Sequence, residues 1–259
     1  MLSLDQIKQP YSNFLHTQPR FLLREYLQYK LLELIYSQKL GGKLVFMGGT
    51  AIRLIHRSQR FSEDLDFDNQ GLNQDQFEQL LTGVRSRLEL EGITSELRFS
   101  HKEAFHCYLK FTNILQQFGL TKQKKEKILI RIDTTSQDYN YQPELKILNK
   151  FDVFVRVPVA PVNLLLAQKL TALLGRKRAK GRDFYDIVFL AGQTEPDYRY
   201  LLEKSQIKNA QQLRQKVTSK IANLNLDDMA DDVAPFLMKK TDRARVEQFD
   251  QFLEEWLAD

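Results

Sequence analysis

The chain contains a single cysteine among its 259 residues, and this scarcity excludes several kinds of site. With Cys107 alone, no disulfide framework can form within the chain and no cysteine-rich metal site can be built, which favours a reducing compartment. We expect Cys107 to be a small core residue of an apolar strand. The four histidines do not recur at the spacing of zinc ligands, and the sequence has neither a nucleophile elbow nor a Walker A lysine motif.

Long apolar runs are also missing from the sequence. The richest run, residues 162–174, is interrupted by Asn163, Gln168 and Lys169 and falls short of the roughly 20 residues that a membrane-spanning helix requires. The first ten residues lack the apolar core of a signal peptide. We therefore expect a soluble, cytoplasmic protein without a membrane partner.

Charge of neither sign dominates, because 38 basic residues stand against 33 acidic ones and give a formal charge of +5. This mild excess permits a polyanionic partner without requiring one. A content of 42% hydrophobic and 27% charged residues is typical of a globular protein. The length suffices for one large domain or two modest ones, each with its own core.

Two glycines, Gly48 and Gly49, follow an apolar run at residues 43–47 that indicates a short buried strand. Glycine permits a tight turn, and Thr50 could cap a helix that extends to about Arg57. The N-terminus of such a helix presents free N–H groups and the positive end of a dipole, and both favour phosphate. We predict that Gly48, Gly49 and Thr50 bind the phosphates of a nucleotide.

Two carboxylates, Asp64 and Asp66, follow shortly after this turn in the sequence Asp-Leu-Asp-Phe. Residues two apart in a strand point to the same face, so these side chains stand together while Leu65 and Phe67 pack on the other face. Like charges so close repel unless a cation lies between them. Hard oxygen ligands of this kind suit Mg²⁺ or Mn²⁺, as metal-assisted phosphoryl or nucleotidyl transfer requires.

These stretches, Gly48-Gly49-Thr50 and Arg60-Phe61-Ser62-Glu63-Asp64-Leu65-Asp66-Phe67, resemble the motifs of the AbiEii/AbiGii toxin family. Its members are nucleotidyltransferases of the DNA polymerase beta-like superfamily and act as toxins of type IV toxin–antitoxin and abortive-infection systems. Thr50 departs from the serine that superfamily members often carry, but it keeps a hydroxyl. The resemblance implies an NTP as substrate, an RNA acceptor such as the 3′ end of tRNA, and a cognate winged-helix antitoxin.

The resemblance also implies a third acidic residue on a neighbouring strand, and Asp133 is the best-placed candidate. Residues 128–134 alternate between isoleucines on one face and Leu129, Arg131 and Asp133 on the other. Alternatively, Asp133 only begins a turn after the strand. On the first interpretation, Asp64, Asp66 and Asp133 are catalytic and hold two Mg²⁺ ions.

A second informative stretch begins at Lys169, which lies among leucines of a predicted helix and must either extend to solvent or contact an anion. The resemblance implies a functional lysine on this helix that contacts the triphosphate. Arg182-Asp183-Phe184-Tyr185-Asp186 matches the Arg-Asp-x-x-Asp motif of the family, and its two carboxylates share a helix face. We expect Lys169 and Asp186 to be catalytic and Lys169, Arg182 and Asp183 to bind the nucleotide.

Structural alternatives stay open for both carboxylates. Asp183 could merely cap its helix and pair with Arg178 or Arg182. Asp186 precedes an apolar run and so needs a partner, either Lys169 or an arginine of the basic loop at residues 176–182. This loop and a lysine-rich connector are candidate contacts to an RNA backbone; the lysines of the connector are Lys122, Lys124, Lys125 and Lys127.

The spacing of apolar residues predicts an α+β chain. We expect a nucleotidyltransferase-like mixed β-sheet with flanking helices in residues 1–158, followed by an α-helical C-terminal domain in residues 159–259. Apart from the elements around the glycine turn and the acidic pair, strands are expected at residues 93–99, 104–112, 128–134 and 152–157. Helices are expected at residues 21–40, 73–90, 162–174, 182–191, 198–204, 210–223 and 242–257.

The reaction predicted from these features is Mg²⁺-dependent transfer of a nucleoside monophosphate from an NTP to an acceptor hydroxyl. One alternative is a non-catalytic nucleotide- or RNA-binding module of the same fold. Another is a metal-dependent nuclease, which also uses paired carboxylates. The glycine turn and the helix after it favour a triphosphate donor over the nuclease.

Overall fold

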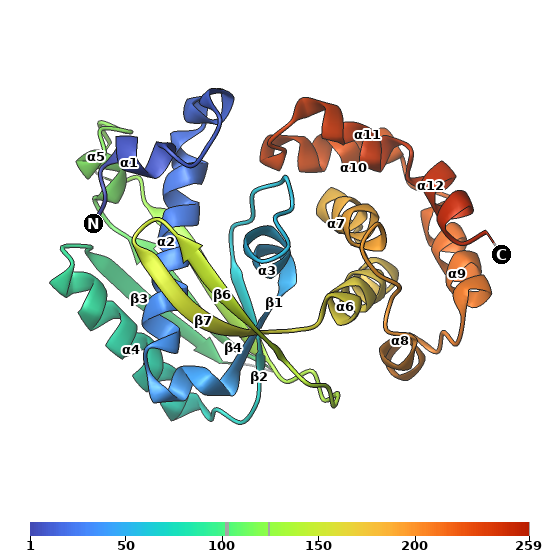
Figure 1. Cartoon of the computed structure of the whole chain (residues 1–259), viewed down its shortest axis with the longest axis horizontal. Helices are drawn as coiled ribbons and strands as arrows, with labels where there is room; N and C mark the ends of the chain where they lie inside the picture. Colours follow the sequence, from blue (N-terminus) through green and yellow to red (C-terminus); the bar gives the residue numbers. More distant parts are fainter. Residues whose placement is uncertain (102–103, 124, 259) are drawn as a thin grey trace. The chain divides into compact units, whose positions relative to one another are not determined.

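A computed structural model describes residues 1–101, 104–123 and 125–258, so Lys124 of the lysine-rich connector lies outside the described residues. The chain forms two compact units (Figure 1). Unit 1 comprises Met1–His56 and Phe61–Val159, and unit 2 comprises Arg57–Arg60 and Ala160–Asp259. Among the described helices, none combines the length and the apolar character that crossing a membrane demands.

Unit 1 is built on a mixed sheet, which has seven strands within the described residues, in the order β3-β4-β5-β2-β1-β7-β6. β2 runs parallel to β5 and antiparallel to β1, while β1 and β7 are parallel. The prediction of an α+β chain with a mixed sheet is therefore confirmed. The strands are β1 (Leu44–Met47), β2 (Leu65–Asn69), β3 (Ser95–His101), β4 (Phe105–Phe111), β5 (Ile128–Thr135), β6 (Glu144–Lys150) and β7 (Val153–Val159).

Strand β6 is an edge strand that the apolar pattern did not predict. Its alternation places the side chains of Leu145 and Ile147 on the exposed face, where they are 64% and 54% exposed. In this strand the buried side chain is Leu148, opposite Val155 of β7. A strand with two of its three apolar residues on the solvent side gives no sign of a buried face.

The helices of unit 1 cover this sheet, and the longest is α2, which contacts β7 and α4. The sequence predicted that this helix extends to residue 40, but it ends at Tyr36. The chain then tightens into the 3₁₀ turn η2, where Gly41 packs so closely that a Cβ atom would lie 2.2 Å from the carbonyl oxygen of Ile35. The elements are α1 (Leu4–Lys8), η1 (Asn13–Thr17), α2 (Pro19–Tyr36), η2 (Lys39–Lys43), α3 (Gly48–Leu54), α4 (Gln74–Leu90) and α5 (Ile114–Gln117).

Unit 2 is helical in the residues that the structure describes, and this part of the prediction is also confirmed. Its core includes Phe184, whose ring meets that of Phe249 edge to face at 4.8 Å. Gly181 lets α7 approach α10 closely, because a Cβ atom there would lie 1.8 Å from the carbonyl oxygen of Met229. The elements are α6 (Val162–Gly175), α7 (Gly181–Ala191), α8 (Tyr198–Ser205), α9 (Ala210–Ile221), α10 (Leu226–Val233), η3 (Ala234–Phe236), η4 (Lys240–Arg243), α11 (Ala244–Glu247) and α12 (Phe249–Trp256).

Two details of unit 2 differ from the prediction. Helix α10 was not expected, and residues 242–257 contain the end of η4 followed by α11 and α12, with a break at Gln248, instead of one helix. Asn225 caps the start of α10, because its side chain accepts hydrogen bonds from the backbone N–H groups of Asp227 and Asp228. Carboxylates in the first turn interact favourably with the positive end of the helix dipole. This polar segment therefore forms a helix, although its composition is typical of a loop.

Candidate active site

The acidic residues predicted in unit 1 face the same side of the sheet. Asp66 in β2 lies directly opposite Asp133 in β5, and Leu65 lies opposite Ile132. Leu65 and Ile132 are fully buried, so the alternation of the strands turns Asp66 and Asp133 to the other face. Asp64, two residues before Asp66, shares this face.

An arginine, Arg131, lies between two of these carboxylates. Its Nε atom is 2.7 Å from Oδ2 of Asp133, and its Nη2 atom is 3.2 Å from Oδ2 of Asp64. Burial alone would lower the pKa of Arg131, but the carboxylates of Asp64, Asp133 and Asp66 raise it above the usual value. A fixed positive charge thus offsets the repulsion between like charges that the sequence implied.

A histidine holds the remaining side of Asp133. His106 lies opposite Asp133 in the register of β4 and β5, and its Nδ1 atom is 2.7 Å from Oδ1 of Asp133. Together with Arg131, it fixes the orientation of this carboxylate. The roles of His106 and Arg131 were not predicted, although the alternation of residues 128–134 had placed Arg131 on the face of Asp133.

The glycine turn packs directly against the acidic strand. Gly48 has a φ angle of +75°, and a Cβ atom on it would lie 2.2 Å from Oδ2 of Asp66. A side chain at this position would therefore be strained in its backbone and would displace the carboxylate. Gly48 keeps the start of α3 in contact with Asp66.

Thr50 does not cap α3, and this expectation was wrong. The helix begins at Gly48 with Met47 in the N-cap position and no side-chain capping hydrogen bond. Thr50 lies inside the first turn, where its hydroxyl donates a hydrogen bond to the backbone carbonyl of Asp64. It therefore connects α3 to the chain just before β2.

The donor chemistry of the three carboxylates fits a hard divalent cation such as Mg²⁺ or Mn²⁺. Their present positions are set by Arg131, which engages Asp64 and Asp133. Within the described part of the chain, no group of three or more His, Cys, Asp or Glu residues is close enough to hold a metal ion. A cation at this site would therefore share or replace the contacts of the guanidinium group.

Helix α3 is anchored on its other side by a buried ion cluster around Glu25 of α2. Arg53 of α3 donates to both oxygens of Glu25, at 2.8 and 3.2 Å, and the ammonium of Lys150 is 2.9 Å away. Tyr11 donates its hydroxyl to the same carboxylate at 2.7 Å. Burial raises the pKa of Glu25, but Arg53 and Lys150 outweigh it and lower this pKa to about 2.

Unit 2 contains a second cluster of motif residues, around Lys169 of α6. Its Nζ atom is 2.8 Å from Oδ2 of Asp186 and 3.3 Å from Oδ1 of Asp183. Its side chain is 15% exposed, whereas Asp186 is fully buried. The expectation that Lys169 contacts an anion is met by carboxylates of its own unit. Burial would lower the pKa of Lys169, but Asp186 and Asp183 raise it.

The buried carboxylate of Asp186 has a second partner, Arg60, that was not predicted. The guanidinium Nε and Nη2 atoms of Arg60 are 2.7 and 2.5 Å from the two oxygens of Asp186, a bidentate pair. Although burial opposes its ionisation, Arg60 and Lys169 keep the pKa of Asp186 below its usual value. Lys169, one of the two partners considered for Asp186, is present. The arginine partner is Arg60 and does not come from the 176–182 loop.

The other residues of the Arg-Asp-x-x-Asp motif also have defined contacts. Asp183 lies in the first turn of α7, where the Nε atom of Arg176 is 3.0 Å from its Oδ2 atom. Its arginine partner is thus neither Arg178 nor Arg182. The guanidinium of Arg182 lies 5.0 Å from the centre of the Phe236 ring. Within this motif, Asp183 and Asp186 therefore share Lys169, and Arg182 lies against an aromatic ring.

Comparison with solved structures supports the fold. A candidate nucleotidyltransferase from H. pylori aligns with a TM-score of 0.57 and 19% identity, covering 92% of this chain and 96% of that one. JHP933 from Helicobacter pylori aligns with a TM-score of 0.54 and 18% identity, covering 92% and 93% of the two chains. At this identity the likeness extends to the fold alone. A search of curated proteins gave no match.

Comparison with protein families gives the identity of the chain. Residues 30–255 match the family described as "Nucleotidyl transferase AbiEii toxin, Type IV TA system". The match includes the glycine turn, the acidic strands and the Lys169 cluster. Such a description implies a nucleotide substrate and an antitoxin partner. The chain belongs to the AbiEii family of nucleotidyltransferase toxins of type IV toxin–antitoxin systems.

Proposed function

We propose that this toxin transfers a nucleoside monophosphate from an NTP to a hydroxyl of an RNA acceptor, with the 3′ end of tRNA as the expected target. The observation that carries the proposal is the shared face of Asp64, Asp66 and Asp133 beside the Gly48 turn. Carboxylates on neighbouring strands next to a helix start combine a cation site with phosphate-binding N–H groups. Modification of tRNA ends in a cell would stop translation.

In unit 1, Asp64, Asp66 and Asp133 would hold Mg²⁺ or Mn²⁺. Such an ion supplies charge neutralisation at the phosphates and a lowered pKa of the attacking hydroxyl. The backbone N–H groups of Gly48, Gly49 and Thr50 would bind the phosphates of the NTP. His106 and Arg131 hold Asp133 in a fixed orientation, so this carboxylate does not have to be ordered when substrate arrives.

In unit 2, we assign phosphate binding to Lys169. Asp186 would orient its ammonium through the 2.8 Å ion pair, and Arg60 would keep that carboxylate ionised. An ammonium group held in place by carboxylates can neutralise charge on a departing pyrophosphate. Asp183 and Arg182 would belong to the same nucleotide-binding group. We expect this toxin to act in the cytoplasm beside its cognate winged-helix antitoxin.

Incubation of the full chain with labelled NTPs, Mg²⁺ and total tRNA tests the proposal. The wild type should transfer label to RNA, and Asp64→Ala and Asp66→Ala should each lose at least about 99% of this activity, since removal of one such group typically costs two or more orders of magnitude. Asp75→Asn is the matched control, because it removes an exposed carboxylate in the first turn of α4. Wild-type protein that leaves all RNA unlabelled would refute the proposed transfer.

A second candidate function is a non-catalytic nucleotide- or RNA-binding module. The ion pairs of Arg131 with Asp64 and Asp133 favour it, because they neutralise two of the three carboxylates. Expression in cells without antitoxin separates the two functions. A binding module should be tolerated equally with and without Asp66→Ala, whereas a transferase toxin should be tolerated only as the variant.

A further inference from the structure

Helix α9 of unit 2 carries positive charge without any acidic residue. Its twelve residues, Ala210–Ile221, include Arg214, Lys216 and Lys220 but neither Asp nor Glu. The next helix, α10, has the opposite composition, with four aspartates among its eight residues and no lysine or arginine. Charge is therefore segregated between consecutive helices, and α9 presents a positive field to an anionic partner.

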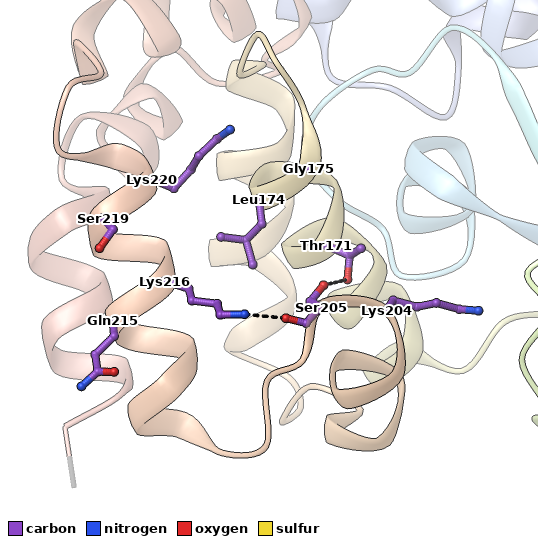
Figure 2. A pocket seen from close by; sticks show the side chains of 9 residues that line it. All are labelled: Thr171, Leu174, Gly175, Lys204, Ser205, Gln215, Lys216, Ser219 and Lys220. Carbon is purple, nitrogen blue, oxygen red and sulfur yellow. Dashed lines mark hydrogen bonds between the residues drawn. The ribbon is translucent and has the colours of Figure 1, made fainter.

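A cavity of about 620 Å³ lies between α6, α8 and α9 (Figure 2). Three lysines line it, and no carboxylate is found among the described residues of its wall. Leu174 of α6 provides an apolar surface between the two lysines that extend from α9. Thr171 and Ser205, whose hydroxyls are 3.2 Å apart, add groups that can donate or accept hydrogen bonds. This size falls within the range of pockets for small organic ligands, roughly 300–1,000 Å³.

Two of these lysines are held by neutral oxygen atoms. The ammonium of Lys216 donates to the backbone carbonyl of Ser205 at 2.7 Å, and that of Lys220 donates to the carbonyl of Arg176 at 2.7 Å. An ammonium has three donors, and a carbonyl leaves its full positive charge in place. Both groups are thus fixed at the wall of the cavity while they retain donors for an anion. Lys204, in contrast, pairs with Glu203 at 2.7 Å.

A second hollow, of about 490 Å³, adjoins the first along α9 and shares Gln215 and Ser219 with it. Arg214 and Thr218 line it on the helix, and Leu257 lines it from the C-terminal segment. Each hollow therefore combines a basic group, an apolar contact and amide or hydroxyl groups. Lys216 and Lys220 are one helical turn apart, about 6 Å along the axis. Two such hollows in series suit consecutive nucleotides of one strand.

We propose that α9 and its two flanking hollows form a binding site for single-stranded RNA. Lysines and Arg214 would contact phosphates, and the bases would make apolar contacts with Leu174 and Leu257. Amide and hydroxyl groups of Gln215 and Ser219 would meet base edges or ribose. A protein partner fits less well, because the core of a protein interface is poor in charged residues and in lysine above all, while basic groups line both hollows beside one leucine each. As a contact to the acceptor, this site rests on the proposed function.

Fluorescence anisotropy with a labelled single-stranded RNA of 12 nucleotides, without NTP, tests the inference on the full chain. The double variant Lys216→Gln, Lys220→Gln removes two phosphate contacts. Each contact contributes a salt exponent of about 0.7, so the variant should bind roughly 25-fold more weakly at 0.1 M salt, with a salt slope lowered by about 1.4. Lys216→Arg with Lys220→Arg should retain affinity, because the charge is kept.

The matched control is the double variant Lys239→Gln, Lys240→Gln, which removes the same charge from exposed positions of unit 2 outside both hollows. It should bind as the wild type does. Equal affinity for the Lys216 and Lys239 double variants, or a wild type that binds no RNA, would overturn the inference. Competition by UMP at the concentration of RNA nucleotides would also overturn it, since the cavity would then be a site for free nucleotide.

The transfer assay with tRNA separates failure of this site from failure of the proposed reaction. If the wild type labels tRNA and the Lys216→Gln, Lys220→Gln variant binds and labels it equally, the α9 site is refuted while the transfer stands. If the wild type binds RNA through α9 but transfers no label, the transfer is refuted and the site stands. Unfolding midpoints of all variants should agree, because neither lysine lies in the core.

Discussion

Replacement of Gly48 by alanine tests whether the close contact between the turn and Asp66 contributes to stability and activity beyond the strain of a positive φ angle. Two costs coincide at this residue: a φ angle of +75° and a Cβ position 2.2 Å from Oδ2 of Asp66. The left-handed conformation costs a non-glycine residue about 1–2 kcal/mol. Displacing a packed neighbour adds about 1–3 kcal/mol, so Gly48→Ala should destabilise unit 1 by roughly 2–5 kcal/mol and move a carboxylate that we assign to the reaction.

Two other glycines provide controls for these costs. Gly71 has a φ angle of +100° but open space around its Cβ position, so Gly71→Ala should show the backbone cost without the clash. Gly42 has open space and no positive φ angle, so Gly42→Ala should cost nothing beyond a few tenths of a kcal/mol. The comparison assigns the extra loss at Gly48 to the contact with Asp66.

Urea denaturation gives the free energy of unfolding of the three variants, and label transfer to tRNA gives their activity. We expect Gly48→Ala to be the least stable variant and to lose transfer, while Gly71→Ala loses stability alone. If Gly48→Ala unfolds at the same urea concentration as Gly71→Ala and remains as active as the wild type, the contact between the turn and the acidic strand does not shape the site.

Three further predictions concern charged side chains. Arg131→Ala should bind Mn²⁺ about tenfold more tightly by calorimetry, because a +1 and a +2 charge roughly 6 Å apart in water repel by about 1.4 kcal/mol; unchanged affinity would contradict this. Arg60→Met should lower the unfolding free energy by about 3–5 kcal/mol in urea, because it leaves Asp186 buried with one cation fewer, and a loss below 1 kcal/mol would contradict it. With a pKa lowered from 4.5 to about 2, Glu25 contributes stability that is present above pH 4.5 and is lost as the pH falls towards 2. The wild type should therefore lose about 3 kcal/mol more than Glu25→Gln over this range, and parallel pH profiles would show that Glu25 does not act in this way.

The acidic face of the sheet was predictable because strand alternation is a local rule. Asp64 and Asp66 are two residues apart, and the period of two places them together whatever the rest of the fold does. Asp133 needed one further step, the pairing of its strand with β2, and the resemblance to a known family supplied it. The position of Arg131 was implied by the same alternation, but no pattern along one strand can say which carboxylates of another strand an arginine will reach.

The contacts that the sequence could not give are those between distant segments. Arg60 and Asp186 are 126 residues apart, and nothing local distinguishes this arginine from the five basic residues of the 176–182 loop. The capping role expected for Thr50 failed for a different reason. A hydroxyl after two glycines fits an N-cap, but Gly48 already starts the helix, and the hydroxyl instead donates to the chain before β2.

The charges of the Lys169 cluster do not balance. Two carboxylates, Asp183 and Asp186, are surrounded by three cations, Lys169, Arg60 and Arg176. Each carboxylate has an arginine partner, so the ammonium of Lys169 is the charge in excess of balance among these five groups. Arg60 is buried, Lys169 is 15% exposed and Arg176 is 38% exposed. Desolvation makes an unbalanced cation in so buried a position costly. The excess charge on Lys169 is what an anionic phosphate would neutralise.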